Sequence, residues 1–118
     1  MGNASLEAMA YRGWFLGHFI EAPDDLRATS TLELKWVNYE PGEGRPTWAV
    51  NQQATTLSIL IRGQFRLRFP EQEVVLHQEG DYALWLPGVA HSWFVEAPST
   101  ILTVRWPSLA GDSQSSQS

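Results

Sequence analysis

Residues 80–93, with the sequence GDYALWLPGVAHSW, contain a turn signal, an apolar run, a corner and the start of a second apolar run. A glycine-aspartate pair opens the segment, Pro87 and Gly88 end the first apolar run, and His91 opens the second. Glycine gives a tight turn its backbone freedom, and proline fixes φ and removes a hydrogen-bond donor. The segment therefore predicts strand, corner and strand, with His91 placed where its side chain can point into the mouth of a barrel.

Short strand signals and turn signals continue through the rest of the chain. Residues 31–37 alternate with period two, so that their apolar residues face one side while Glu33 and Lys35 face the other. Residues 55–69 form two further alternating runs, and residues 41–46, PGEGRP, are the densest cluster of turn residues. Strands of this length and spacing, without a long helix, predict an all-β fold, an antiparallel sandwich or barrel.

Length and composition predict one β domain with two less ordered ends. A chain of 118 residues with 43% apolar residues has enough material for a single modest core. Residues 1–10 carry weak structural signals, so a weakly structured N-terminus is expected, and residues 11–108 hold the strand signals. Residues 109–118 end in a Ser/Gln-rich run, which predicts a disordered tail.

The charge balance and the absence of cysteine limit the partners and the compartment. The formal net charge is −5, so the surface does not attract phosphate backbones and we expect no nucleic-acid partner. No apolar run reaches the roughly 18 residues that span a bilayer. The N-terminus lacks a basic segment followed by an apolar one, so we expect no membrane partner and a cytoplasmic location, with which the lack of cysteine agrees.

Residues 44–95 resemble the two conserved motifs of the cupin superfamily. The second motif runs glycine, five residues, Pro-x-Gly, two residues, histidine, three residues, asparagine. Here Gly80, Gly88 and His91 match, the proline is displaced by one position, and Val95 stands at the asparagine position. The resemblance implies an antiparallel double-stranded β-helix, the jelly-roll barrel of this superfamily, in a small single-domain protein.

The first motif keeps its turns but not its metal ligands. In the cupins two histidines and a glutamate of this motif, with the histidine of the second motif, usually hold a divalent metal. Gly44 and Gly63 match the motif glycines. The ligand positions read Val50, Gln52 and Thr56. A tight site for a divalent metal needs about three or four strong nitrogen, sulfur or carboxylate ligands, so we expect no metal and no other cofactor. One alternative is a site that the fold assembles from His18, His77 and His91.

The resemblance and the period-two alternation together predict a pocket inside the barrel. Thr56 occupies the glutamate position, which points inward, and Ser58 shares its face. His91 and Trp93 share a face after the corner, and Arg105 would be costly to bury unpaired. The predicted pocket residues are Asn51, Gln52, Gln53, Thr56, Ser58, Trp85, His91, Trp93 and Arg105. The two tryptophans alternatively belong to the core or to a dimer interface, and the histidine alternatively has a structural role.

Three functions are compatible with such a pocket. The first is a metal-independent, cupin-like protein that binds a small organic molecule in its barrel for sensing, sequestration or regulation. The second is a metal-independent isomerase or epimerase that uses His91 as a general base, with Arg105 or an amide stabilising negative charge. The sequence places no partner acid, so whether the protein is an enzyme stays open. The third is a structural or interaction module whose barrel is filled by side chains.

The outer face of residues 55–62 predicts a homodimer. Leu57, Ile59 and Ile61 face away from Thr56 and would be exposed in a monomer. Soluble monomers seldom leave large apolar patches open, so a second subunit is the expected cover.

Overall fold

A computed structural model describes residues 1–116 of the chain. Its elements are α1 (Ala4–Glu7), the 3₁₀ turn η1 (Ala8–Tyr11), β1 (Trp14–Leu16), β2 (Glu33–Tyr39), β3 (Trp48–Asn51), β4 (Thr55–Arg62), β5 (Phe65–Phe69), β6 (Gln72–Leu76), β7 (Tyr82–Trp85), β8 (Ser92–Val95), β9 (Ser99–Trp106) and β10 (Ser113–Ser116). The strands pair antiparallel throughout this range, which confirms the all-β antiparallel prediction. Within residues 1–116, no helix combines the length and the apolar character that crossing a bilayer requires.

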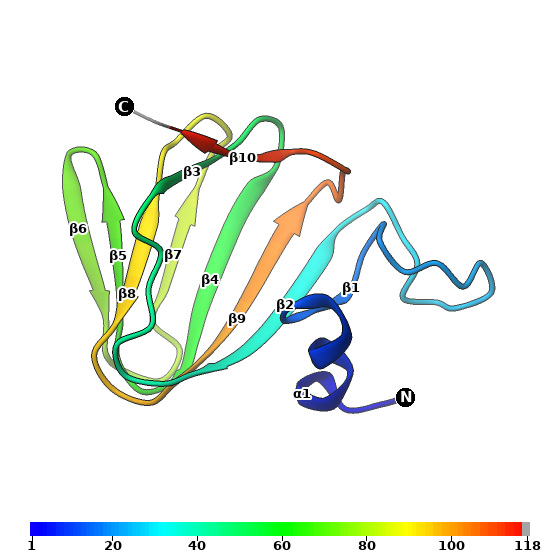
Figure 1. Ribbon diagram of the computed structural model, residues 1–118, viewed down its shortest axis with the longest axis horizontal. Coiled ribbons are helices and arrows are strands. Elements are labelled where there is room, and N and C mark those ends of the chain that lie inside the picture. The colour runs from blue at the N-terminus through cyan, green and yellow to red at the C-terminus, as the bar shows by residue number, and fades with distance from the viewer. Residues whose placement is uncertain (117–118) are drawn as a thin grey trace.

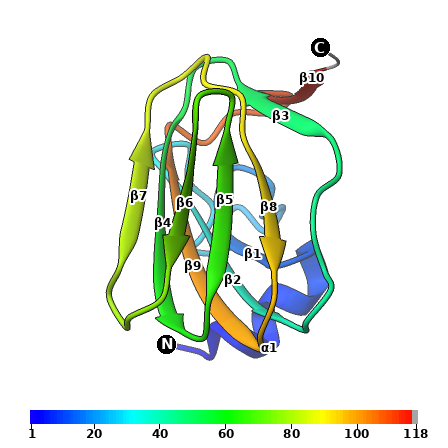
Figure 2. The same ribbon diagram turned by 90° about the vertical axis from the view of Figure 1, so that its left-hand side faces the viewer.

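Two antiparallel layers lie face to face, as Figures 1 and 2 show. One layer is a five-stranded sheet in the order β1-β2-β9-β4-β7, and the other contains β6-β5-β8. Isolated bridges from Gly44 to Phe94 and from Ala49 to His91 attach the β3 segment to the β8 segment, and β10 pairs with β3. The second layer therefore continues as β6-β5-β8-β3-β10, which gives the jelly-roll arrangement that the sequence predicts.

The apolar core occupies one end of the space between the layers. Leu60 of β4 and Val95 of β8 are fully buried, and the ring centroid of Phe65 lies 5.6 Å from that of Trp93 and 5.7 Å from that of Tyr39. The buried apolar cluster comprises Tyr39, Leu60, Phe65, Leu67, Leu76, Trp85, Val95 and Ile101. Burying one large apolar side chain stabilises a fold by about 1.5–3 kcal/mol, so this cluster holds the two layers together.

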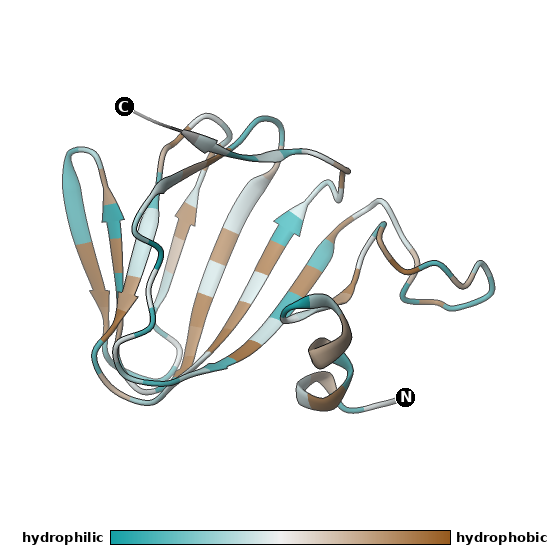
Figure 3. Cartoon of the chain, in the orientation of Figure 1, coloured by the Kyte–Doolittle hydropathy of each residue, from teal (hydrophilic) through white to brown (hydrophobic). Residues whose placement is uncertain are grey.

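Toward the opposite end, the inward side chains of the five-stranded sheet become polar. The paired inward positions of β4 and β9 are, in order, Leu60–Ile101, Ser58–Thr103 and Thr56–Arg105. Strand β2 follows the same gradient, from Tyr39 at the core end to Lys35 and Glu33 at the other. Figure 3 shows hydrophilic residues at the corresponding ends of β9 and β2. The polar end of the interior is therefore the place to look for a functional site.

Strand β2 alternates as predicted, and its charged face is the inner one. Glu33 is buried, and Lys35 lines the interior. Leu34 and Trp36 lie on the outer face, in register with Val104 and Leu102 of β9. Alternation defines two faces of a strand, but the neighbouring strands decide which face is covered.

Both ends of the chain are more ordered than the sequence predicts. At the N-terminus Asn3 caps α1 by accepting a hydrogen bond from the Leu6 backbone N–H at 3.1 Å. At the C-terminus β10 pairs with β3, which corrects the predicted disorder of residues 109–118 for the part that the structure describes. The reason is that β3 offers unpaired backbone groups along its edge, a partner that Ser/Gln composition does not reveal. Residues 117–118 of the predicted tail lie outside the described residues.

Candidate functional site

A small space, here called the interior cavity, lies at the polar end of the barrel. Its volume is about 60 Å³, which is roughly the share of two water molecules in the liquid. Its lining comes from both layers and includes Lys35, Arg45, Thr56, Ser58, Trp85, His91, Trp93, Thr103 and Arg105. Ser58 Oγ and Thr103 Oγ1 are hydrogen-bonded at 3.0 Å, which ties β4 to β9 in the cavity wall.

Three cationic side chains line the interior cavity: Lys35, Arg45 and Arg105. Within residues 1–116 one carboxylate, that of Glu33, forms an ion pair with one of them. Arg105 Nη1 lies 3.8 Å from Glu33 Oε2, and the Arg105 guanidinium lies over Trp14 at 4.9 Å from the ring centroid. Lys35 Nζ lies 5.5 Å from the same centroid. Burial lowers the pKa of Lys35 to about 8, and the charges of Arg105 and Arg45 act in the same direction. The interior is therefore electropositive, although the chain carries a net charge of −5.

Several buried polar atoms of the site have no hydrogen-bond partner in the described part of the chain. They are Arg45 Nε, Asn51 Oδ1, Thr56 Oγ1, Trp85 Nε1 and Arg105 Nε. A buried polar atom without a partner costs about 1–3 kcal/mol, and native interiors leave few of them. Three of these atoms are N–H donors, so an acceptor from outside the chain would complete the site.

His91 is buried in the wall of the interior cavity and is neutral at neutral pH. The residue is 5% exposed, its Nδ1 lies 3.1 Å from the Val89 carbonyl oxygen, and its ring packs against Trp85. Because a carbonyl only accepts, Nδ1 carries the proton and Nε2 is an acceptor. Burial lowers the pKa of His91 to about 4; the hydrogen bond to Val89 opposes this shift, and the charges of Arg105 and Arg45 add to it. In residues 1–116 no carboxylate is paired with the ring, which disfavours a general base here.

The buried His91 should make the protein less stable in mild acid. Its folded pKa of about 4 lies below its ordinary value of 6.5, so between these values the unfolded state binds the proton and the folded state does not. The free energy of unfolding is therefore unaffected by His91 protonation above pH 6.5. It decreases as the pH falls from 6.5 to 4, by up to about 3 kcal/mol. In urea unfolding curves across this window, His91→Gln should flatten the pH dependence relative to the unmodified protein. His77→Gln provides the control, because it removes an exposed imidazole outside the interior cavity. Equal slopes in His91→Gln and the unmodified protein would contradict the assignment.

The structure brings six of the nine predicted pocket residues together around the interior cavity. These are Thr56, Ser58, Trp85, His91, Trp93 and Arg105. Asn51 lies next to them at the mouth of the barrel, where its Nδ2 donates to Asp112 Oδ2 at 3.2 Å. Gln52 and Gln53 are exposed and line neither space, so their predicted place in the pocket is corrected.

The register of β3 differs by one residue from the prediction, which explains why Gln52 lies outside the pocket. Gln53 lies beyond the end of β3, in the bend before β4. Ala49 and Asn51 are 3% and 2% exposed, whereas Val50 and Gln52 are more exposed. Two backbone hydrogen bonds of 2.9 Å between Ala49 and His91 fix this register. The inward side chains beside His91 are thus a methyl and an amide from β3 and a hydroxyl from β4, which remain poor ligands for a divalent metal.

Within residues 1–116 no group of three or more His, Cys, Asp or Glu side chains is arranged to hold a metal ion. This finding contradicts the alternative site built from the three histidines. His18 Nδ1 is hydrogen-bonded to Ser108 Oγ at 2.6 Å, and His77 is an exposed side chain 3.7 Å from Asp81 Oδ2. Each histidine therefore has a separate local environment.

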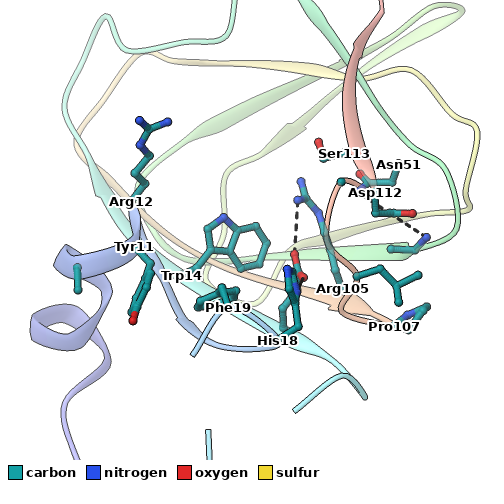
Figure 4. Close-up of a pocket in the computed structure, with 15 residues that line it drawn as sticks. Tyr11, Arg12, Trp14, His18, Phe19, Asn51, Arg105, Pro107, Asp112 and Ser113 are labelled. Carbon is teal, nitrogen blue, oxygen red and sulfur yellow. Dashed lines mark hydrogen bonds and ion pairs between the residues drawn. The ribbon is translucent and has the colours of Figure 1, made fainter. Parts of the chain in front are cut away.

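A larger space, here called the mouth pocket and drawn in Figure 4, shares lining residues with the interior cavity. Its volume is about 470 Å³, which is in the size range of small-molecule sites. Trp14 and Phe19 contribute aromatic surface from the N-terminal part of the chain, and Arg105 lies between them and Asp112. Arg105 and Ser113 line both spaces, so the two are neighbours that share part of their wall and are treated together as the candidate site.

The sequence did not predict a site role for Trp14 and Glu33, which line the mouth pocket, or for the buried Ser108 that contacts Glu33. Ser108 Oγ donates to Glu33 Oε1 at 2.7 Å, and this carboxylate is the ion-pair partner of Arg105. Trp14 faces the same guanidinium from β1. These contacts join segments about 70 to 90 residues apart in the chain, so a local sequence pattern did not reveal them. The one available signal was the alternation that puts Glu33 on the same face of β2 as Lys35.

Comparisons with known proteins identify the fold. Neither a protein-family profile nor a curated protein sequence matches the chain. Solved structures do match. An uncharacterized conserved protein with a double-stranded β-helix domain from Klebsiella pneumoniae aligns with a TM-score of 0.66 and 19% identity, over 76% of this chain and 78% of that chain. KdgF from Halomonas sp. aligns with a TM-score of 0.62 and 17% identity, over 69% and 74% of the two chains.

A third match extends this group. The sugar phosphate isomerase of the cupin superfamily from Silicibacter pomeroyi aligns with a TM-score of 0.58 and 22% identity, over 65% of this chain and 51% of that chain. The strand order, the closure of the second layer through β3 and these structural matches agree. The chain has the double-stranded β-helix fold of the cupins.

Proposed function

We propose that this chain binds a small organic molecule, without a metal ion, in the mouth pocket and the neighbouring interior cavity. The observation that carries the proposal is the position of Arg105. Its side chain lines both spaces, stacks over Trp14 and leaves Nε without a partner among the described residues. A preformed concavity with aromatic walls and a few convergent polar groups is the usual form of a small-molecule site.

The size of the two spaces separates this proposal from a filled structural module. The interior cavity alone, at about 60 Å³, has room for about two water molecules, which would fit a barrel filled by side chains. The mouth pocket adds about 470 Å³, which is enough for a compact organic ligand. The solved structure of a sugar phosphate isomerase with the same fold supports the view that this scaffold accommodates small polar molecules.

Metal independence is proposed from the chemistry of the inward side chains. The residues around His91 are Ala49, Asn51 and Thr56, which offer no second imidazole, thiolate or carboxylate. The neighbouring Arg45 and Arg105 add positive charge to the same space. A cation would therefore meet weak ligands and electrostatic repulsion.

Ligand binding should appear as thermal stabilisation that depends on Trp14. We expect at least one member of a panel of small organic metabolites to raise the melting temperature by about 10 °C at 100 times its Kd, because binding to the folded state alone adds about 2.7 kcal/mol at that ratio. The rise in melting temperature should be lost in Trp14→Ala, since this change removes the Trp14 ring from the wall of the mouth pocket. It should persist in Leu26→Ala, whose side chain is fully exposed. The absence of any increment, or its persistence in Trp14→Ala, would contradict the proposed site.

We further propose that the outer face of the five-stranded sheet is covered by a second copy of the chain. The outward positions of β2, β9, β4 and β7 form an apolar face of Leu34, Trp36, Leu57, Ile59, Tyr82, Leu84, Leu102 and Val104. Tyr82 and Leu84 are 63% and 55% exposed, and none of the eight side chains is charged. A two-fold contact brings the same patch of both subunits together, so an uncharged apolar face is self-complementary.

Subunit association should depend on Leu84. Light scattering of the unmodified protein should give twice the mass of one chain, and Leu84→Lys should give a monomer, because the substitution places a charge within the apolar face. Leu26→Lys introduces the same charge at an exposed position outside this face and should leave the dimer intact. A monomeric unmodified protein, or a dimeric Leu84→Lys variant, would contradict this arrangement.

A further inference from the structure

The positive charges around the interior cavity are not balanced by the carboxylates near them. Arg105 Nη1 and Glu33 Oε2 are 3.8 Å apart, which is an ion pair but too long for a hydrogen bond. The other oxygen of Glu33 accepts a hydrogen bond from Ser108 Oγ at 2.7 Å. No carboxylate in residues 1–116 lies within ion-pair distance of Lys35 or Arg45. Buried charges are costly unless they are paired, so the site lacks negative charge.

Asp112 does not supply the missing charge, because its carboxylate oxygens are already hydrogen-bonded within the turn between β3 and β4. Its Oδ1 accepts from the Gln53 N–H at 2.7 Å, and its Oδ2 accepts from the Ala54 N–H and from Asn51 Nδ2, both at 3.2 Å. These contacts hold the carboxylate on the turn between β3 and β4. Its influence on Arg105 is therefore a distant one rather than a hydrogen bond.

The buried N–H donors without partners, like the unbalanced positive charges, indicate an anionic ligand. Nε of Arg45 and Nε of Arg105 are buried N–H groups with no acceptor among the described residues, and Trp85 Nε1 is a third. Guanidinium groups match the planar geometry of a carboxylate through parallel N–H···O bonds. An anionic acceptor would satisfy these donors and the charge deficit together.

The dimensions of the two spaces favour one kind of anion. The interior cavity, at about 60 Å³, has the volume of about two water molecules, which suits the two oxygens of a carboxylate better than the four of a phosphate. Beyond Arg105, the mouth pocket offers the rings of Trp14 and Phe19. An aromatic or aliphatic body attached to the carboxylate would lie on these rings.

We propose that the ligand is a small monocarboxylate, with its carboxylate bound by Arg105 and Arg45 in the interior cavity and its apolar body packed on Trp14 in the mouth pocket. This inference rests on the proposed small-molecule site and adds the chemical class of the ligand. Lys35, which also faces the cavity, contributes a third positive charge without a carboxylate partner in the described part of the chain.

Calorimetric titration with matched acids and amides tests the proposal on the unmodified protein. The probes are acetate, benzoate and phenylacetate, each compared with its amide, and inorganic phosphate. At least one acid should bind at least tenfold more tightly than its amide, because hydrogen bonds to charged groups are the stronger ones. Binding of that acid should also weaken with added salt. Binding of phosphate in preference to all three acids would overturn the assignment to a carboxylate.

Substitution of the arginines then locates the site. Arg105→Gln and Arg45→Gln should each weaken binding of the preferred acid by about tenfold or more, while Arg68→Gln, at an exposed position of β5, should not. Circular dichroism shows whether each variant is folded, and the acid-amide comparison on the unmodified protein needs no variant at all. Equal binding of acids and amides would overturn the monocarboxylate proposal but leave a small-molecule site intact. Failure of every acid to bind would overturn it too, whereas the general site fails only if the wider metabolite panel also gives no stabilisation.

Discussion

Replacing Gly63 with alanine should destabilise the fold by about 3 kcal/mol or more. Gly63 joins β4 to β5 with φ of 100°, a conformation that side chains rarely adopt. A Cβ at this position would overlap the Pro98 carbonyl oxygen and lie 2.6 Å from Ser99 Cα. Both contacts involve backbone atoms. The Ser99 hydroxyl accepts a hydrogen bond from the Gln64 backbone N–H and donates one to the Gln64 carbonyl oxygen, each at 2.9 Å. The neighbouring segment therefore has little freedom to move away.

A matched control for Gly63 exists at the Pro-Gly corner. Gly88 has φ of 85°, but a Cβ there would meet nothing within 4 Å. Gly88→Ala should therefore lose only about 1–2 kcal/mol, the cost of the left-handed conformation alone. Urea unfolding of the two variants at the same pH gives both free energies. Equal losses of unfolding free energy would contradict the expectation that the close approach of Gly63 to Pro98 and Ser99 adds to the cost of a side chain there.

Replacing Asp112 with alanine should destabilise the protein by about 3 kcal/mol and release the C-terminal strand. The carboxylate accepts hydrogen bonds from two backbone N–H groups and from Asn51, and Asn51 and Ala54 are almost fully buried. Removing it leaves these donors without a partner. It also frees β10, whose pairing with β3 begins at the next residue, Ser113.

Hydrogen exchange measures this release directly. In Asp112→Ala, amides of residues 48–51 and 113–116 should exchange faster, while amides of β4 and β9 should stay protected apart from the general loss of stability. Asp24→Ala removes an exposed carboxylate far along the chain and should change neither the exchange nor the free energy of unfolding. Unchanged protection of β3 in Asp112→Ala would contradict the role of this carboxylate as a clamp.

The strands and corners of the barrel were predictable because their signals are local. The cupin resemblance implied that Thr56 points inward, and period-two alternation put Ser58 on the same face of β4 and Arg105 on one face of β9 with Thr103, where the structure has them. Glycines at the corners marked turns such as the one at Gly63, whose positive φ the structure shows. The same alternation cannot say which face is covered, so the inward charge of Lys35 was not expected.

The rest of the site depends on contacts between distant segments. Strand β3 has four residues and follows a long loop, so its phase is set by its backbone pairing with His91 rather than by its own pattern. Strand β10 consists of serine and glutamine, and its order comes from the edge of β3 and from Asp112. Trp14 contacts Arg105 across the barrel mouth. A sequence pattern carries no signal for such pairings, because each residue is ordinary in its own segment.

Crystals of the purified protein, measured for anomalous scattering at the absorption edges of iron and zinc, test the central proposal most directly. We predict no anomalous peak beside His91 and Thr56, and ordered density for a small molecule between Arg105 and Trp14 after soaking with the acid that binds best. A transition-metal peak coordinated by His91, with the soaked acid absent from the mouth pocket, would contradict it.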